Sequence, residues 1–93
     1  MLQMETRHWE ILCSILTKYP YKFYAYGSRV KGQAKEYSDL DLCYYEEMPW
    51  SNFSSLKEDL EKSYLPFKVD LVYWEWMSLE FKEMIRGDLV LVV

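Results

Sequence analysis

Histidine and cysteine are scarce in this sequence, which has one of the first and two of the second. The cysteines, Cys13 and Cys43, form neither a CxxC pair nor a cluster with histidine, so nothing indicates a metal or dithiol motif. They are expected to be small buried apolar residues in a reducing compartment. His8 lies beside an aromatic residue in an expected helix, and a surface or capping role is favoured over a catalytic one.

Positive charge and long apolar runs are also in short supply. The formal net charge is −4 and the pI is about 4.9, which argues against non-specific attraction to DNA, RNA or an anionic membrane. The same acidity suits divalent cations, whose charge would offset clustered carboxylates. No segment resembles a signal peptide or is long enough to span a bilayer. We therefore expect a cytoplasmic protein with no direct nucleic-acid or membrane partner.

Linkers, repeats and low-complexity tracts are not found either, and the 93 residues are expected to form a single domain over 1–93. Hydrophobic residues make up 51% of the chain and aromatic residues 18%. A domain of this size buries roughly 60–65% of the surface that its unfolded chain exposes. Some aromatic surface should therefore remain outside, where an apolar patch often marks a partner surface.

The spacing of apolar residues predicts a small sheet covered by helices. The expected helices cover 2–19, 53–64 and 77–85, with a possible helical turn at 28–32. The expected strands cover 22–26, 39–45, 67–73 and 89–93. A capping box at Ser55 and Glu58 is expected to begin the second helix, and Gly87 is expected to end the last one as a C-cap.

A Gly-Ser pair follows the first expected strand. Gly27 would let the backbone turn sharply and let a ligand approach closely. The N–H groups of a helical turn after it would face that ligand, a position that favours phosphate, with the Ser28 hydroxyl as an added donor. Arg29 or Lys31 could add positive charge. A plain turn is the simpler explanation of the pair taken alone.

Two aspartates, Asp39 and Asp41, open the second expected strand directly after Ser38. Side chains at i and i+2 of a strand point the same way, with alpha carbons about 6.5 Å apart. Carboxylates placed in this way can share oxygens between two Mg²⁺ ions about 3.5–4 Å apart, an arrangement used in displacement at phosphorus. For an isolated D-x-D, a strand edge with solvent-facing acids is the simpler explanation.

A third aspartate, Asp70, lies in the middle of an otherwise apolar strand, with no cation expected beside it on the same face. An acid in a core strand is costly unless it meets a metal or a partner. If strand 67–73 lies beside strand 39–45, Asp70 completes a cluster of three carboxylates. There it could hold one metal and take a proton from an attacking hydroxyl. The alternative is a strand-end acid that pairs with an arginine.

Taken together, these motifs resemble the signature of the DNA polymerase β-like nucleotidyltransferase superfamily. The matching residues are Gly27-Ser28, then Gly32, then Ser38-Asp39-x-Asp41, and finally Asp70 as the third acid. The short length and the closing segment 84–91 are similar to its minimal nucleotidyltransferase branch. The resemblance implies an α+β (α/β) nucleotidyltransferase fold, a small mixed sheet flanked by helices. It also implies transfer of a nucleoside monophosphate from ATP or another NTP to a hydroxyl.

The resemblance further implies a role for each matching residue. Asp39 and Asp41 would ligate both of two Mg²⁺ ions, while Asp70 would ligate the catalytic ion and act as base. Gly27 and Ser28 would bind the triphosphate. The residues expected at the nucleotide are Gly27, Ser28, Arg29, Lys31, Gly32 and Ser38.

Two positions depart from the family pattern. Val30 stands where a small alanine is usual, and could crowd the turn against the sheet. Lys31 stands where arginine is common, so a bidentate phosphate contact would become a point charge. Neither change removes a catalytic group.

The acceptor follows from the size of the chain and from the resemblance. Members of the minimal branch are paired with a HEPN-domain protein, a ribonuclease toxin that they neutralise by adding AMP to a tyrosine. Because 93 residues leave no room for an acceptor-binding domain, we expect an antitoxin-like protein adenylyltransferase with a HEPN partner. Two alternatives stay open: a module that inhibits its partner by contact alone, and a small-molecule nucleotidyltransferase of the antibiotic-modifying kind.

Overall fold

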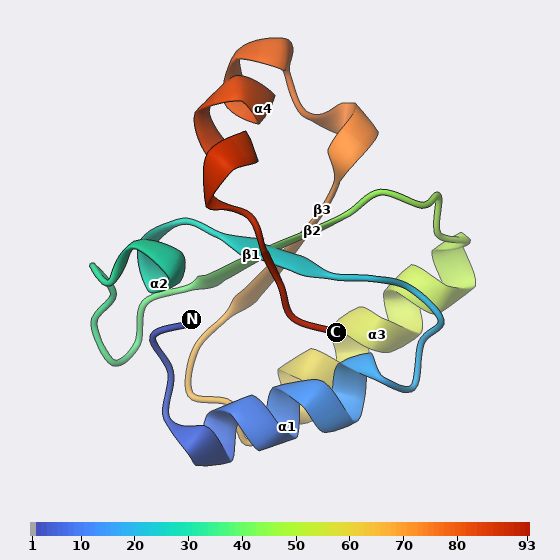
Figure 1. Cartoon of the computed structure of the whole chain (residues 1–93). Coiled ribbons are helices and arrows are strands. Elements are labelled where there is room, and N and C mark those ends of the chain that lie inside the picture. Colours follow the sequence, from blue (N-terminus) through green and yellow to red (C-terminus); the bar gives the residue numbers. More distant parts are fainter. Residues whose placement is uncertain (1) are drawn as a thin grey trace.

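A four-stranded mixed sheet forms the centre of the computed structural model, which describes residues 2–93 (Figure 1). Its strands are β1 (Tyr24–Tyr26), β2 (Leu40–Tyr44), β3 (Val69–Tyr73) and β4 (Val90–Leu91). They lie in the order β3-β2-β1-β4, with β2 and β3 parallel and β1 antiparallel to both of its neighbours. The predicted α+β class with a mixed sheet is therefore confirmed.

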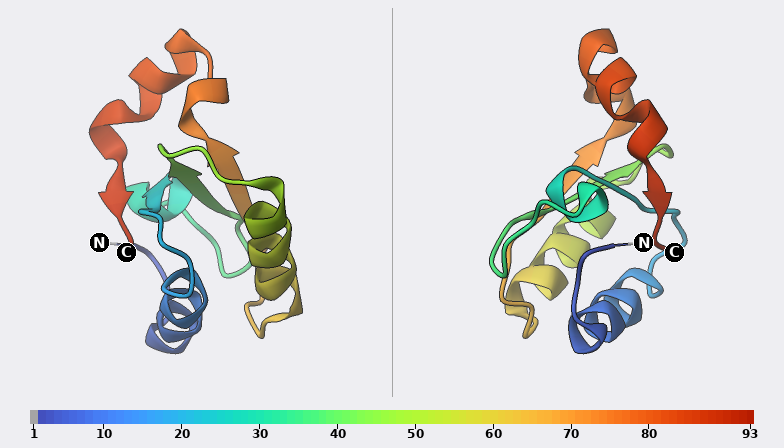
Figure 2. Two further views of the ribbon diagram at one scale, coloured as in Figure 1. Left: turned by 90° about the vertical axis from the view of Figure 1, so that its right-hand side faces the viewer. Right: turned by 60° about the vertical axis from the view of Figure 1, so that its left-hand side comes forward.

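Helices connect these strands and cover the sheet unequally. The helical elements are α1 (Thr6–Leu16), α2 (Ser28–Lys31), α3 (Trp50–Lys62) and α4 (Leu79–Ile85), with 3-10 turns η1 (Trp74–Trp76) and η2 (Arg86–Asp88). Helix α3 makes the crossover that two parallel strands require. It lies beside α1 on one side of the sheet, while α4 lies at the opposite end of the molecule (Figure 2). None of the helices in residues 2–93 has the length and apolar composition needed to cross a membrane.

The main core lies between the sheet and the pair α1 and α3. Leu40 and Leu42 point to this side because alternate residues of a strand share a face, and both are fully buried. Leu12 of α1 and Leu56 of α3 are fully buried against them. The leucines of β2 therefore face the helices.

The other face of the sheet carries a smaller apolar cluster. Its buried members are Tyr26, Cys43, Trp74, Met77 and Ile85. They come from β1, β2, η1 and α4 and from the segment between η1 and α4. Because Asp41 alternates with Leu40 and Leu42, its side chain belongs to this second face.

The two predicted helix-end motifs, the capping box and the glycine C-cap, are wrong. Helix α3 begins at Trp50 with Pro49 as its N-cap, and the Phe53 N–H donates to the Pro49 carbonyl at 3.0 Å. Ser55 and Glu58 therefore lie inside the helix and form no capping box. At the end of α4, Gly87 does not adopt the left-handed conformation of a C-cap, because the chain continues in the right-handed 3-10 turn η2.

Burial also corrects the expectation for histidine. His8 is only 8% exposed, its ring meets Phe67 edge-on, and its Nδ1 lies 3.4 Å from a Glu5 carboxylate oxygen. It is a buried residue of α1 and not a surface one. Cys43 is buried as predicted, Cys13 is half-buried, and both are free thiols.

Exposed aromatic surface is present, as the composition predicts. Two exposed tryptophans lie in different parts of the fold, on α3 and on η1. The exposed aromatic side chains are Tyr37, Tyr45, Trp50, Tyr64, Trp76 and Phe81. Their use as a partner surface stays a prediction.

Candidate active site

Two carboxylates meet across the parallel strands of the sheet. Asp41 of β2 and Asp70 of β3 are directly paired in register, so their side chains leave the same face of strands that lie about 4.8 Å apart. Both side chains are half-buried. The predicted neighbourhood of strands 39–45 and 67–73 is thereby confirmed, and it brings the second and third acids together.

Charge repulsion and burial act on this pair. The pKa of Asp41 is raised above its ordinary value by burial first, then by the charge of Asp70 and then by that of Asp39. Both of the other acids therefore act electrostatically on Asp41. A group with a raised acid pKa holds its negative charge at a cost, which a nearby cation would offset.

Asp39 is the most exposed of the three acids. It precedes the first residue of β2 and its side chain is exposed. Within residues 2–93, no three His, Cys, Asp or Glu side chains are grouped closely enough to hold a metal ion as they stand. The structure thus brings Asp41 and Asp70 together and leaves Asp39 at the edge of the pair.

A lysine lies beside the third acid, contrary to expectation. Lys68 Nζ is 3.4 Å from Asp70 Oδ1, and their side chains are 66% and 34% exposed. The two residues are separated by one position, so the alternation of the strand places them on one face. The carboxylate of Asp70 is therefore partly compensated by a solvent-exposed ammonium group.

The backbone at Gly27 packs directly against the carboxylate of Asp41. A Cβ atom at Gly27 would lie 2.6 Å from Asp41 Oδ2, closer than real Cβ contacts allow. The residue also has φ 86° and ψ −156°, a conformation that only glycine adopts readily. Both observations explain why glycine is needed where β1 ends.

The short turn α2 follows this glycine. The Gly27 carbonyl accepts a hydrogen bond from the Lys31 N–H at 3.2 Å. Ser28 is the first residue of α2, and an N–H group in the first turn of a helix has no partner within that helix. Gly32 ends the turn in the left-handed conformation, with φ 73°. Val30 packs against the main core, so the larger side chain is accommodated there.

Arg29 does not belong to the face of the acids, and its predicted contact with the nucleotide is not supported. It is only 4% exposed, and its guanidinium lies over the Phe67 ring at 4.1 Å. Its donors are taken by the main-chain carbonyls of Gln3, Glu36 and Ser38. The guanidinium of Arg29 therefore binds main-chain carbonyls inside the fold.

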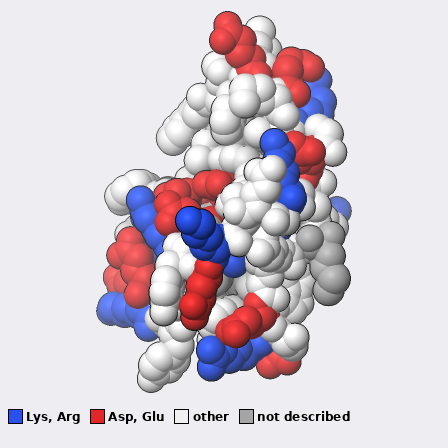
Figure 3. All heavy atoms as spheres, turned by 90° about the vertical axis from the view of Figure 1, so that its left-hand side faces the viewer, with Lys and Arg blue, Asp and Glu red and all other residues white. Residues whose placement is uncertain are grey.

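Lys31 and Ser38, which are also expected at the nucleotide, have partners of their own. Lys31 Nζ lies 3.6 Å from Asp88 Oδ2 at the surface. The Ser38 hydroxyl accepts a hydrogen bond from the Lys35 N–H at 2.8 Å. Basic and acidic side chains are interspersed on the face shown in Figure 3, with no broad basic area among the residues described there.

Tyr26 is a neighbour of the site that the sequence interpretation missed. It is paired in register with Asp41, and burial first, then Asp41, Cys43 and Asp70, raise its pKa to about 12. Its ring meets Phe81 of α4 edge-on at 5.8 Å, so α4 reaches the border of the site. The strand alternation that placed the aspartates would also have placed this residue.

The chain is similar to known proteins over most of its length. The family model described as "Polymerase beta, Nucleotidyltransferase" matches residues 10–93, a range that contains every residue of the site. The chain is similar to the "Probable protein adenylyltransferase MntA" of Haemophilus influenzae, with 46% identity over 74 residues. This similarity covers 77% of the chain and 65% of the relative, so the chain spans slightly less than two thirds of that protein's length.

Proposed function

Because the chain belongs to the polymerase beta nucleotidyltransferase family, we propose that it moves AMP from ATP to a hydroxyl group on a partner protein. The predicted membership of this family and of its minimal branch is confirmed by the family match and by the likeness to MntA. The chain is thus a nucleotidyltransferase. The choice of ATP, of a protein acceptor and of a HEPN-domain partner is the proposal.

The proposed reaction is a displacement at the α-phosphorus of ATP. The acceptor oxygen forms a bond to that phosphorus, the bond to the β-phosphate oxygen breaks, and pyrophosphate leaves. The proton of the hydroxyl passes to a carboxylate. Asp70 is the proposed base because it is paired with Asp41 on the neighbouring strand and its side chain is 34% exposed, so an acceptor hydroxyl can reach it.

The acids of the site fit a divalent cation. Mg²⁺ is commonly held by one or two carboxylates together with substrate phosphates, and Asp41 and Asp70 form such a pair. Burial and the charges of Asp70 and Asp39 raise the pKa of Asp41, and a cation beside Asp41 would offset this cost of its negative charge. When bound, Mg²⁺ would neutralise triphosphate charge and make the phosphorus more electrophilic. A second ion would require Asp39 as a further ligand.

The chain's own residues would orient the triphosphate next to these acids. Gly27 has no side chain, so its backbone lies directly against the Asp41 carboxylate, at a point where a Cβ atom would be 2.6 Å from Oδ2. Ser28 offers a main-chain donor and a hydroxyl donor at the start of α2. Gly32 lets the chain leave α2 in a left-handed turn.

The observation that carries the proposal is the register of Asp41 and Asp70, together with the contact of Gly27 on Asp41. The test is mass spectrometry of a HEPN-domain partner after incubation with the chain, ATP and Mg²⁺. A mass gain of one or more AMP units is expected. No gain in a folded complex would refute the enzymatic part of the proposal.

Asp41→Asn separates chemistry from binding. We expect this variant to form the complex and to lose the label, because the amide keeps the shape of the side chain but not its charge. Glu61→Gln is the matched control, since Glu61 is an exposed acid on α3. Neutralisation of the partner that survives Asp41→Asn would favour a module that acts by contact alone. Turnover of an aminoglycoside by the isolated chain would favour the small-molecule alternative.

A further inference from the structure

We propose that Gln3 and Arg29 form a clamp on the loop 33–38 and thereby position Asp39 for metal binding. Gln3 is a positioning residue in this proposal, since it lies outside the acid cluster. The inference rests on the proposed role of Asp39 as a metal ligand.

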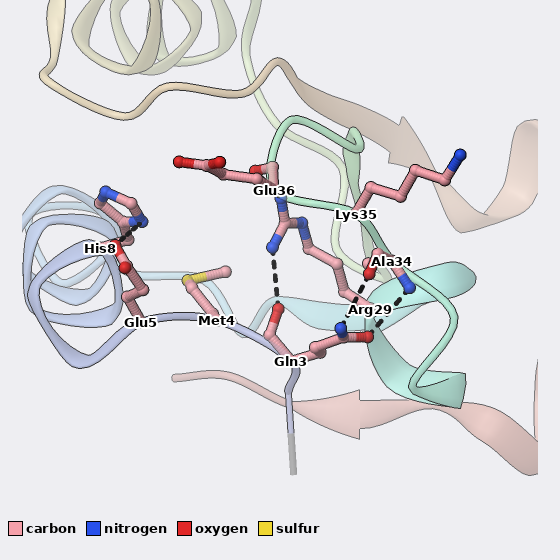
Figure 4. Close-up of a pocket in the computed structure, with 8 residues that line it drawn as sticks. All are labelled: Gln3, Met4, Glu5, His8, Arg29, Ala34, Lys35 and Glu36. Atoms are coloured by element: carbon pink, nitrogen blue, oxygen red, sulfur yellow. Dashed lines mark hydrogen bonds and ion pairs between the residues drawn. The ribbon is translucent and has the colours of Figure 1, made fainter.

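The side-chain amide of Gln3 makes two hydrogen bonds to the main chain of Ala34. Its Nε2 donates to the Ala34 carbonyl at 2.8 Å, and its Oε1 accepts from the Ala34 N–H at 2.9 Å. The Gln3 main chain is itself held, because its N–H donates to the Arg29 carbonyl at 2.7 Å. Figure 4 shows these contacts on one side of a pocket between the N-terminal segment and the loop.

Arg29 fastens the same loop closer to the acids. Its Nη1 donates to the Gln3 carbonyl at 2.8 Å and its Nη2 to the Glu36 carbonyl at 3.1 Å. Nε and Nη2 both donate to the Ser38 carbonyl, at 3.0 and 2.7 Å. Hydrogen bonds from a charged donor are stronger than those from a neutral one, and burial keeps water from competing for them.

These bonds end at the peptide that leads into Asp39. The Ser38 carbonyl belongs to the peptide group that joins Ser38 to Asp39. On the other side, the Leu40 N–H donates to the Lys68 carbonyl at 2.9 Å, where the ladder between β2 and β3 begins. Asp39 is therefore an exposed residue held between a clamp and a sheet, and the position of its carboxylate depends on both.

The N-terminal half of the clamp lies outside the region that matches the family. That match covers residues 10–93, whereas Gln3 precedes it. The Arg29 side chain does not hold the loop at Ala34, because its hydrogen bonds go to the main-chain carbonyls of Gln3, Glu36 and Ser38. Gln3 thus contributes a contact that the matched region does not supply.

Gln3→Met is the variant that tests this role. It preserves the approximate shape of an exposed side chain and removes both hydrogen bonds to Ala34, whereas truncation of buried Arg29 risks unfolding the chain. Removing a residue that supports a metal ligand weakens metal binding by about 10-fold to 100-fold. Because Gln3 acts through the loop, we expect Mn²⁺ affinity to fall about 10-fold, at the lower end of that range.

Asn52→Leu is the matched control. Asn52 Nδ2 donates to the Tyr21 hydroxyl at 3.0 Å, a side-chain contact between distant segments on the helical side of the molecule. We expect this variant to bind Mn²⁺ as the wild type does. Hydrogen exchange measured by mass spectrometry should become faster over 33–39 in Gln3→Met and stay unchanged there in Asn52→Leu.

The double variant with Asp39→Asn completes the test, with Mn²⁺ affinity measured by titration. If Gln3 acts through Asp39, adding Gln3→Met to Asp39→Asn causes no further loss of affinity. Additive losses, or unchanged affinity in Gln3→Met while Asp39→Asn weakens binding, would overturn the clamp alone. Unchanged affinity in Asp39→Asn would overturn the proposed metal role of that residue, and the clamp proposal with it.

Discussion

Replacing Gly27 with alanine perturbs the closest contact in the candidate site. The new Cβ would begin 2.6 Å from Asp41 Oδ2, and ordinary van der Waals contact begins at 3.4 Å. Either the carboxylate or the backbone must move to relieve this overlap. We expect the carboxylate to move, because a side chain rotates more easily than a strand shifts.

Two separable effects follow from this change. A side chain at φ 86° and ψ −156° strains the backbone by about 1–3 kcal/mol, and each kcal/mol lowers Tm by about 4–8 °C in a domain of this size. Displacing a catalytic group by about 1 Å reduces the reaction rate by about 100-fold. We therefore expect Gly27→Ala to remain folded at low temperature with about 1% of the wild-type kcat.

Two other glycines allow the effects to be measured apart. Gly32 has φ 73° but no atom within 4 Å of a Cβ, while Gly87 has neither a positive φ nor a near neighbour. Gly32→Ala should lose stability through strain, and Gly87→Ala should change little. Thermal unfolding and the rate of AMP transfer are measured for all three. Equal rate losses in Gly27→Ala and Gly32→Ala, or a nearly active Gly27→Ala, would refute the importance of the contact with Asp41.

Three further variants test charge and packing. Folding raises the pKa of Asp41, so the ionised carboxylate destabilises the metal-free fold at a pH above that raised pKa. This penalty disappears as the pH falls below the ordinary pKa of an aspartate. Asp41→Asn should therefore raise Tm at pH 7, and its Tm should approach that of the wild type in acid. Lys68→Met removes a cation 3.4 Å from Asp70 and should tighten Mn²⁺ binding by up to about threefold, a small effect because the pair is exposed. Leu56→Ala empties a fully buried position and should lower the unfolding free energy by about 2–5 kcal/mol in urea titrations, with kcat unchanged below the transition.

The sequence predicts the acid pair because a strand has a period of two. Asp41 falls between Leu40 and Leu42, so burying the leucines against helices places the aspartate on the other face. The pairing of Asp41 with Asp70 also depends on the prediction that strand 67–73 lies beside strand 39–45. The register of Asp41 with Asp70 confirms it. The same period also places Tyr26 beside Asp41 and Lys68 on the face of Asp70, which contradicts the expectation that no cation lies beside Asp70.

The role of Arg29 could not be predicted in the same way. Its partners are main-chain carbonyls of an irregular loop and of the N-terminal segment, and a local pattern carries no information on such carbonyls. A lysine or arginine after a Gly-Ser pair is equally compatible with a phosphate contact. The predicted capping box at Ser55 is also wrong, because Pro49 is the N-cap and α3 already begins at Trp50.

Two unfavourable features of the fold meet at one point of the molecule. Gly27 holds a backbone conformation that other residues resist, and Asp41 holds a charge that its surroundings disfavour. Neither is required by the main apolar core, which lies on the opposite face of the sheet. Their contact places a side-chain-free stretch of backbone against an undercompensated carboxylate. A cation bound to Asp41 and shared with a phosphate would relieve the charge, so this point of the sheet is where the proposed chemistry has the strongest physical basis.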